Sequence, residues 1–570
     1  MRASSILRIR IIVGAVLFIA LILIARLYQV QILHASEYRD QASRQYIHTT
    51  SNLFDRGSIY LTTKDGEEVS AATLKVGYIL AINPAEVKDV DGTYTAINNI
   101  VPINKEDFIK RADKKGDTYE EITTRVSEEN TARIKSLKLI GVRLYRDQWR
   151  YYPGGALAAH ALGFVGYDGD QLVGRYGLER YYNDRLERSG KKVSVNFFAE
   201  IFGNLGIFTF DAKKNQESDI ITTIEPTVSR MLDKELATAH EKLKSKLTGG
   251  IVMDPKTGAI IAMSIVPNYD LNNRTDVDIA RFRNPLVEDF FEMGSIIKPL
   301  TVAAGLDSHA ISANTTYFDA GHLDMDGYTI YNFDKRGRGT VPMQEILSQS
   351  LNTGVAFIEK TMGKKTFRNY FTSLDLGTET GIDLPNETHG RIDNILTSPR
   401  DIEYATASFG QGIAMTPIET IRALAALGNG GMLVTPHLVK KIRLEDGTEQ
   451  EVSQPDPKRV WTEGTSEEIS RMLTVVVDKA LRGGTKKNEH YSVAAKTGTA
   501  QIANPKGGGY YDDRYLHSFF GYFPSYNPKF IIFLFTVEPQ GVKYASETLT
   551  EPFINMSHFL INYYNIPPDR

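Results

Sequence analysis

Three short polar motifs, far apart in the sequence, constrain most strongly what this 570-residue chain can fold into. They begin at Ser295, Ser350 and Lys496 and consist of Ser-Ile-Ile-Lys, Ser-Leu-Asn and Lys-Thr-Gly-Thr. Together they supply a nucleophilic hydroxyl, two candidate proton carriers and a lysine that can hold an anionic substrate. These are the groups needed for acyl transfer through a serine ester. A fold that uses them must bring all three motifs to one cleft.

The local sequence around the first motif predicts where its serine lies. Any one motif alone also fits a solvated helix face or a polar turn. However, Ser295 follows Gly294 and precedes an apolar run, which indicates a sharp turn into a buried helix. Lys298, three residues on, shares the helix face of the serine. Pro299 is tolerated only in a first helical turn, so we expect Ser295 at the helix N-terminus, where amide dipoles favour an oxyanion.

The lysine of the first motif, Lys298, is expected to have a lowered pKa. A buried lysine loses the solvation of its charged form, which lowers its pKa. A second cation nearby, Lys496, would lower the pKa of Lys298 further. Lys298 is then predicted to be neutral and able to accept the serine proton.

The second motif is predicted to lie in a loop. Residues 341–347 have the pattern of a helix, and a second helix is expected near 353–360. Ser350 and Asn352 fall between them. A loop between rigid helices suits polar groups that must point into a cleft.

The third motif is predicted to lie on a strand. It follows the small apolar residues 493–495 and includes Lys496, Thr497, Gly498 and Thr499. Gly498 is expected to let another backbone, such as an added substrate strand, approach closely.

The composition excludes several classes of protein. The chain has no cysteine, which rules out disulfides and cysteine-ligated zinc. Its net charge of −3, from 66 basic and 69 acidic residues, does not suggest a nucleic-acid partner. The eleven histidines show no metal-ligand spacing, and His517 is predicted to be structural. We therefore expect no metal and no cofactor.

The N-terminus has the pattern of a membrane anchor. Residues 11–25 are uncharged, and a helix over about 10–32 spans roughly 30 Å, with Arg26 snorkelling to the outer interface. Arginines precede the segment, which predicts a cytoplasmic N-terminus. The alternative is a cleaved signal peptide, but no small-x-small cleavage site follows the apolar run, so an uncleaved anchor is favoured.

The three motifs together resemble those of the penicilloyl serine transferases, which comprise penicillin-binding proteins and serine β-lactamases. Further segments, spread over nearly the whole chain, resemble class B penicillin-binding proteins; they are residues 56–60, 81–84, 152–166, 176–179, 250–263, 267–270 and 409–417. Met293 stands where the family usually has proline, and this departure is expected to alter the cleft entrance.

The resemblance implies an α+β fold with a single transmembrane helix, an elongated pedestal and a penicillin-binding transpeptidase domain. That domain has an antiparallel sheet flanked by helices, as in serine β-lactamases. The expected divisions are a cytoplasmic tail (1–9), the anchor (10–32), a dimerisation-type pedestal (35–218) and the transpeptidase domain (219–565). Strands are expected at 250–264, around Lys496, at 519–523 and at 530–537. The implied location is the bacterial plasma membrane, with the catalytic domain outside the cytoplasm.

The resemblance also implies D,D-transpeptidation of peptidoglycan stem peptides that end in D-Ala-D-Ala, with β-lactams as covalent inhibitors. It assigns roles to the motifs in order: Ser295 as nucleophile, Lys298 as base, Ser350 and Asn352 as proton shuttle and orienting groups, and Lys496, Thr497, Gly498 and Thr499 as substrate-binding residues. The backbone N–H groups of Ser295 and Thr499 would form the oxyanion hole.

The implied partners are a membrane glycosyltransferase of the SEDS type and other proteins of a division or elongation complex. Lys-Thr-Gly and the segment 409–412 favour the septal, FtsI-like branch over the elongation type. Two other classes stay open: a hydrolase of the D,D-carboxypeptidase or β-lactamase type, and a non-catalytic β-lactam sensor or division scaffold. The phenylalanine-rich segment 197–210 is either a buried pedestal hairpin or a docking surface.

Overall fold

The computed structural model describes residues 54–169, 171–188 and 217–570, together with 13–14, 17–23, 26, 28 and 29. Much of the expected anchor and the whole phenylalanine-rich segment 197–210 lie outside the described residues. Across the described part of the chain, no helix is both long and apolar enough to cross a membrane. The described residues form two compact units. The first contains residues 74–149, and the second contains 56–73, 150–188 and the chain from 217 onward.

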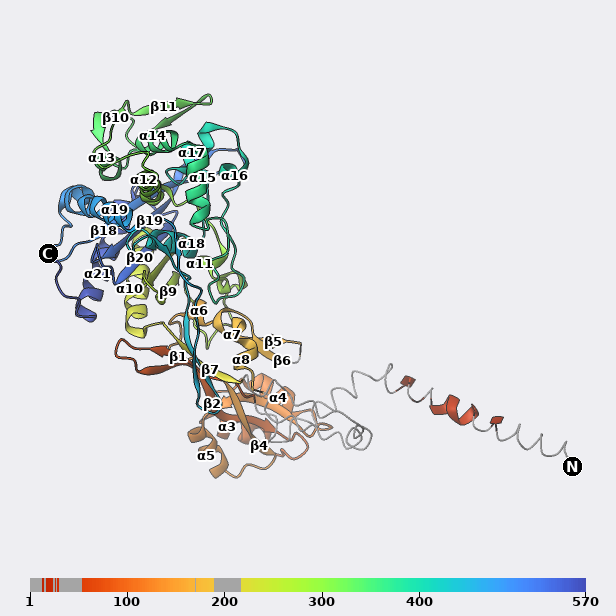
Figure 1. Ribbon diagram of the computed structural model, residues 1–570. Coiled ribbons are helices and arrows are strands. Elements are labelled where there is room, and N and C mark those ends of the chain that lie inside the picture. The colour runs from red at the N-terminus through yellow and green to blue at the C-terminus, as the bar shows by residue number, and fades with distance from the viewer. Residues whose placement is uncertain are drawn as a thin grey trace. The chain divides into compact units, whose positions relative to one another are not determined.

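The first unit packs short helices against strands around a small apolar core (Figure 1). Its strands are the C-terminal part of β2 (Glu68–Ile82), β3 (Glu120–Val126) and β4 (Val142–Tyr151), and β2 pairs with both of the others. Its helices are α3 (Val90–Asn98), α4 (Lys105–Ala112) and α5 (Glu128–Ser136). Each helix begins after a residue whose side chain accepts a backbone N–H of the first turn, namely Asp89, Asn104 and Ser127.

The second unit is built on a five-stranded antiparallel sheet (Figure 1). The strand order is β18 (Ala494–Ala503), β19 (Tyr510–Phe523), β20 (Phe530–Val537), β8 (Leu247–Met253) and β9 (Ile260–Val266). The strands predicted from the sequence all belong to this sheet. β18, with the Lys-Thr-Gly motif, lies at one end of the strand order, and β19 is its sheet neighbour.

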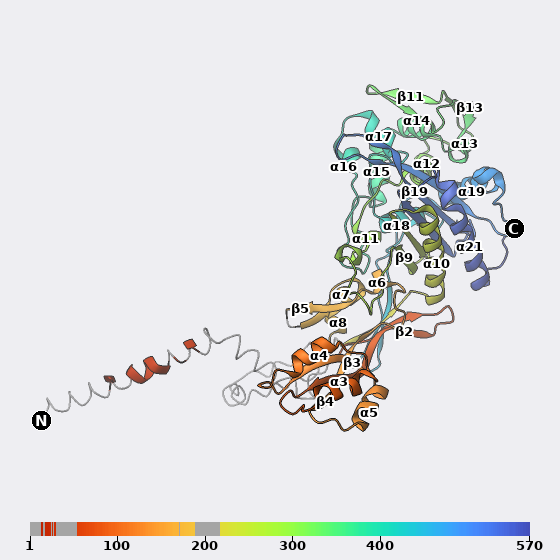
Figure 2. The same cartoon turned by 180° about the vertical axis from the view of Figure 1, so that it is seen from behind.

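Both faces of this sheet are covered, because side chains alternate between two apolar cores. On one face, Val252, Phe519 and Ile532 pack with α10 (Pro226–Leu243) and α21 (Thr550–Tyr563). Figure 2 shows these two helices side by side. On the other face, Ile251, Phe520 and Phe533 join the larger core that contains α12 (Lys298–Asp307) and α18 (Pro417–Ala425). The central strand β20, which is buried on both faces, is therefore apolar at nearly every position.

The remaining elements of the second unit surround this sheet. Its helices also include α13 (Met343–Ser348), α14 (Asn352–Met362), α15 (Lys364–Ser373), α16 (Asp393–Thr397), α17 (Asp401–Ala407), α19 (Glu463–Val475) and α20 (Ala545–Thr548). Its short strands include β10 (Thr316–Asp319), β11 (His322–Met325), β12 (Tyr328–Tyr331) and β13 (Gly339–Pro342), which form two hairpin-like pairs, β10 with β13 and β11 with β12.

Segments from the N-terminal half complete the second unit. β1 (Ile59–Thr62) pairs with β7 (Ser218–Thr222), which pairs with β15 (Val439–Leu444), followed by β16 (Glu449–Glu451). The smaller elements are α6 (Ala159–Leu162), β5 (Val165–Asp168), β6 (Gln171–Gly174), α7 (Gly177–Tyr181), α8 (Asn183–Leu186), α11 (Pro285–Glu288), β14 (Met432–Leu433) and β17 (Lys458–Arg459).

Candidate active site

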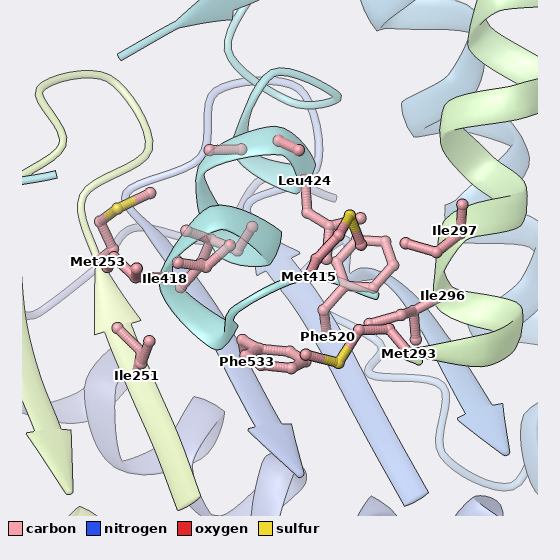
Figure 3. Packing of buried hydrophobic residues seen from close by; sticks show 14 of the residues in the cluster. Ile251, Met253, Met293, Ile296, Ile297, Met415, Ile418, Leu424, Phe520 and Phe533 are labelled. Atoms are coloured by element: carbon pink, nitrogen blue, oxygen red, sulfur yellow. The ribbon is translucent and has the colours of Figure 1, made fainter. Parts of the chain in front are cut away.

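Ser295 lies in a single 3₁₀ turn, Gly294–Ile297, that leads directly into α12. Helix α12 begins at Lys298, so Pro299 occupies its first turn, as the sequence predicted. The residues on either side of the serine are buried in the larger core, where Met293 and Ile296 lie beside Phe520 and Phe533 (Figure 3). This packing holds the turn against the sheet. It also corrects one expectation: Met293 is part of the core and does not line the cleft entrance.

Two glycines bring the serine turn close to the motif strand. Gly294 has φ +65°, and a Cβ there would stand 2.9 Å from the carbonyl oxygen of Thr499. A Cβ on Gly498 would stand 2.3 Å from Ser518 Oγ and 2.7 Å from the carbonyl oxygen of Met293. Gly498 therefore makes room for Ser518 on β19 and for Met293, next to the serine turn. The approach of an added substrate strand to Gly498 stays a prediction.

The Ser350 loop is held in an unusual backbone conformation. Ser350 has φ +55°, which is costly for a residue with a side chain, and it lies between α13 and α14 as predicted. A buried polar network fixes the following helix. Asn332 accepts the backbone N–H of Asn352 at 3.0 Å, and Asn332 donates to Asp319 at 2.9 Å. The Asn352 side chain donates to the carbonyl of Tyr331 at 2.8 Å, which orients this amide at the cleft.

The three motifs meet at the hydroxyl of Ser350. Lys298 Nζ donates to Ser350 Oγ at 3.1 Å and to the Ser350 carbonyl at 2.5 Å. Lys496 Nζ donates to the same Ser350 Oγ at 3.2 Å and to the carbonyl of Thr497 at 3.0 Å. Among the described residues, Ser295 Oγ makes no hydrogen bond, and catalytic hydrogen bonds are often absent before substrate binds.

Burial lowers the pKa of both lysines, and for Lys298 this is the direction that the sequence predicted. Burial, and then the charge of Lys496, lower the pKa of Lys298 well below its ordinary value. Burial lowers the pKa of Lys496 to about 8. At neutral pH, Lys298 is therefore the group suited to accept a proton, and Lys496 is the group that remains mostly charged.

The motifs open into a cleft of about 970 Å³. Ser295, Ser350, Asn352, Lys496, Thr497 and Thr499 all line it. Lys298 and Gly498 lie behind this lining, and Lys298 Nζ contacts the lining residue Ser350. Within the described ranges, no cluster of His, Cys, Asp and Glu could hold a metal ion.

Sequence reasoning missed a carboxylate next to the serine turn. Glu292 accepts hydrogen bonds from the hydroxyl of Tyr510, at 3.0 and 3.2 Å, and Tyr510 lines the cleft. Burial raises the pKa of Glu292 to about 7, although the hydrogen bonds from Tyr510 and from the backbone of Gly412 oppose the shift. The spacing of three residues from Ser295 was visible in the sequence, but its tyrosine partner was not.

His517, predicted to be structural, is buried beside the motif strand. Its ring contacts Thr548 Oγ1 at 3.1 Å and the carbonyl of Lys543 at 3.0 Å. Burial lowers the pKa of His517 to about 4, so the ring is neutral near pH 7 and adds no charge to the site.

Two protein families match this chain. The penicillin binding protein transpeptidase domain matches residues 248–556, and the penicillin-binding protein dimerisation domain matches residues 54–205. Stage V sporulation protein D of Bacillus subtilis is 30% identical over 95% of this chain and 83% of its own length. Peptidoglycan D,D-transpeptidase FtsI of Buchnera aphidicola is 24% identical over 99% of this chain and 96% of its own length.

Solved structures share the fold. Penicillin-binding protein 2X of Streptococcus thermophilus superposes with a TM-score of 0.72 over 90% of this chain and 81% of its own, at 21% identity. Penicillin-binding protein 3 of Mycobacterium tuberculosis, complexed with ampicillin, gives a TM-score of 0.65 over 75% of this chain and 91% of its own, at 26% identity.

The fold, together with a cleft that Ser295 lines and two buried lysines that meet at Ser350, defines an acyl-transferring enzyme of the penicillin-binding type. With both family domains present in order, the chain belongs to the class B penicillin-binding proteins, and it is a peptidoglycan D,D-transpeptidase.

Proposed function

We propose that Ser295 is the nucleophile of this transpeptidase and that Lys298 is its base. The Ser295 oxygen attacks the carbonyl of the penultimate D-Ala of a stem peptide, and its proton passes to the neutral amine of Lys298. The C–N bond to the terminal D-Ala breaks, and that proton goes to the leaving amine. Ser350 and Asn352 relay the proton and orient the substrate amide.

The second half of the reaction restores the enzyme. An amine of a neighbouring stem peptide attacks the serine ester, the ester C–O bond breaks, and Ser295 Oγ regains a proton. The product is the cross-link. As the resemblance to the family implies, the backbone N–H groups of Ser295, in the turn before α12, and Thr499, on β18, stabilise the oxyanion of both steps.

Lys496 and Thr497 hold the terminal carboxylate of the stem peptide. A lysine that remains mostly protonated at pH 7 supplies a charge-assisted contact at this position. β-Lactams present a carboxylate and a reactive carbonyl with similar placement, so they acylate Ser295 and remain bound as esters.

One observation supports these roles most directly. Ser350 Oγ lies 3.1 Å from Lys298 Nζ and 3.2 Å from Lys496 Nζ, so one hydroxyl links the proposed base to the proposed carboxylate site. A proton relay through this hydroxyl needs both contacts.

Fluorescent penicillin labelling tests the assignment. Ser295→Ala should abolish covalent labelling and leave the melting temperature unchanged, because a methyl group cannot form the ester. Ser348→Ala is the matched control, since Ser348 lines the same cleft and has no assigned role. Undiminished labelling of Ser295→Ala would reject the proposed mechanism.

We further propose that the enzyme works at the division septum, anchored by residues 10–32. A pedestal over 35–218 would carry a transpeptidase domain over 219–565, and a SEDS-type glycosyltransferase would be the membrane partner. The Lys-Thr-Gly motif and segment 409–412 favour this branch. A version that begins at Ala35 should still bind penicillin and yet fail to support growth. Full complementation by that version would reject the membrane partnership.

One observation favours a second role, in sporulation: the relative with 30% identity is a stage V sporulation protein. A fluorescent fusion separates the two possibilities. Accumulation at midcell during growth supports the septal role, whereas signal confined to sporulating cells supports the second.

A further inference from the structure

The cleft carries more positive charge than one terminal carboxylate requires. Its lining includes five cationic side chains, namely Lys335, Arg338, Arg482, Lys496 and Lys543, and no aspartate or glutamate. Arg338 is neutralised by Asp334 through an ion pair at 2.8 Å. Within the part of the chain that the structure describes, Lys335, Lys543 and Lys496 make no ion pair.

Two of these lysines belong to an exposed aromatic rim, which we define as Tyr331, Phe333, Lys335, Lys543 and Tyr544. The rings of Phe333 and Tyr544 pack edge to face with centroids 5.8 Å apart, so the two segments of the rim meet. Lys335 Nζ lies 5.1 Å from the ring centroid of Tyr331, and Lys543 Nζ lies 5.6 Å from that of Tyr544. Phe333 is 54% exposed, and together with the exposed Tyr331 and Tyr544 it forms an exposed aromatic cluster at the cleft.

Each segment of the rim is hydrogen-bonded to one of the site motifs. The carbonyl of Tyr331 accepts from Asn352 Nδ2 at 2.8 Å. The backbone N–H of Ala545 donates to Thr499 Oγ1 at 3.1 Å, and the carbonyl of Lys543 contacts His517. The rim is thereby fixed next to the second and third motifs.

We propose that the aromatic rim binds a second carboxylate of the donor stem peptide, upstream of D-Ala-D-Ala. This inference rests on the proposed function, because it places the terminal carboxylate at Lys496. The rings pack against the peptide's aliphatic parts, and Lys335 and Lys543 attract the anion. Two residues of a stem peptide can supply that carboxylate: the γ-linked D-glutamate at the second position, or a diaminopimelate-type residue at the third.

Competition against fluorescent penicillin tests the rim without requiring turnover. Four soluble pentapeptides would be compared, with the second and the third carboxylate each either free or amidated. Wild-type protein should be protected from labelling about 5-fold more strongly by a free-carboxylate peptide than by its amide, as one or two exposed ion pairs would supply. The position whose amidation removes the advantage identifies the source. The advantage should shrink in roughly 0.5 M salt.

The variants locate the effect on the rim. In a double variant with Lys335→Gln and Lys543→Gln, the free and amidated peptides should protect equally. A double variant with Lys335→Arg and Lys543→Arg should restore the preference. Lys365→Gln, an exposed lysine on α15 away from the cleft lining, should keep the wild-type preference.

The outcomes separate this inference from the proposed function. Normal penicillin labelling with no preference for any free carboxylate overturns the inference alone. The same conclusion follows if the double Gln variant keeps the preference. Absence of penicillin labelling in the wild type would overturn the proposed function as well.

Discussion

Two clusters of buried charge lie in the second unit, and they differ in whether the charges are matched. Around Glu179, Arg56 and Arg150 each approach the carboxylate at 2.6 Å, and all three side chains are buried. Around Ser350, Lys298 and Lys496 are equally buried but have the same sign, and no carboxylate accompanies them among the lining residues described.

The effects on pKa are accordingly opposite. Burial alone would raise the pKa of Glu179, but Arg150 and Arg56 outweigh it and hold the pKa below its ordinary value, so the charge is kept. Burial and the charge of Lys496 lower the pKa of Lys298, which favours its neutral form. A buried carboxylate that is paired with buried arginines therefore supports the fold. Two buried lysines without a carboxylate instead produce a base.

The largest expected effect is on catalysis. Lys298→Ala removes the base, and acylation by penicillin should fall at least about a thousandfold. More ligand should not restore it, because the missing step is proton transfer. Stopped-flow or gel-based acylation rates over a range of penicillin concentrations measure this. A variant that recovers at high concentration would show that Lys298 serves binding.

Glu179→Gln should act on stability and not on chemistry. It leaves two buried arginines without their carboxylate, which typically costs about 3–5 kcal/mol. Thermal unfolding should show a large fall in melting temperature, while the protein still folded at low temperature should be acylated at the normal rate. In the wild type, this contribution is present above the unfolded-state pKa of the carboxyl and is lost as pH falls through the lowered folded-state pKa. An unchanged melting temperature would contradict the claim that the Glu179 cluster stabilises the fold.

Lys496→Ala should give a smaller catalytic defect. It removes a charge-assisted contact of about 1.5–3 kcal/mol, so acylation should slow by about one to two decades and be partly rescued by more ligand. In the wild type, carboxylate binding should weaken as pH rises through about 8, where Lys496 loses its proton. If Lys496→Ala and Lys298→Ala behave alike, their proposed division of roles is wrong.

The smallest expected effect is a gain in stability. A buried lysine with a lowered pKa destabilises the folded state near neutral pH, and the deficit shrinks as pH rises toward the ordinary value of 10.5. Lys298→Met should therefore raise the free energy of unfolding at pH 7 by about 1 kcal/mol, although the enzyme is inactive. Lys335→Met, at an exposed position, serves as the control. A destabilised Lys298→Met protein would contradict the claim that burying Lys298 without a carboxylate costs stability.

Local sequence patterns predicted much of the site because its key constraints are local. Pro299 in a first helical turn fixed the helix start, and the apolar runs near 519–523 and 530–537 marked two strands of the central sheet. The lowered pKa of Lys298 was predicted from its burial and from the charge of Lys496, which the motifs place nearby. The predicted helix over 341–347 was partly wrong, because β13 extends to Pro342 and α13 begins at Met343.

What the sequence did not reveal depends on contacts between distant segments. Nothing local to Phe333 indicates that it packs on Tyr544, and the Asp319–Asn332 network becomes visible only when β10 and β12 are placed beside α14. A close approach at Gly498 was predicted, but its neighbours within the chain, Ser518 and Met293, were not, because both are distant in the sequence.

The central claim is that Lys298 is uncharged at neutral pH while Lys496 remains mostly protonated. Nuclear magnetic resonance titration of lysine labelled with ¹³C at Cε measures both pKa values, with Lys298→Arg and Lys496→Arg assigning the two signals. The account predicts one signal that titrates far below 10.5 and a second that titrates near 8. Two signals that both titrate near 10.5 would contradict it.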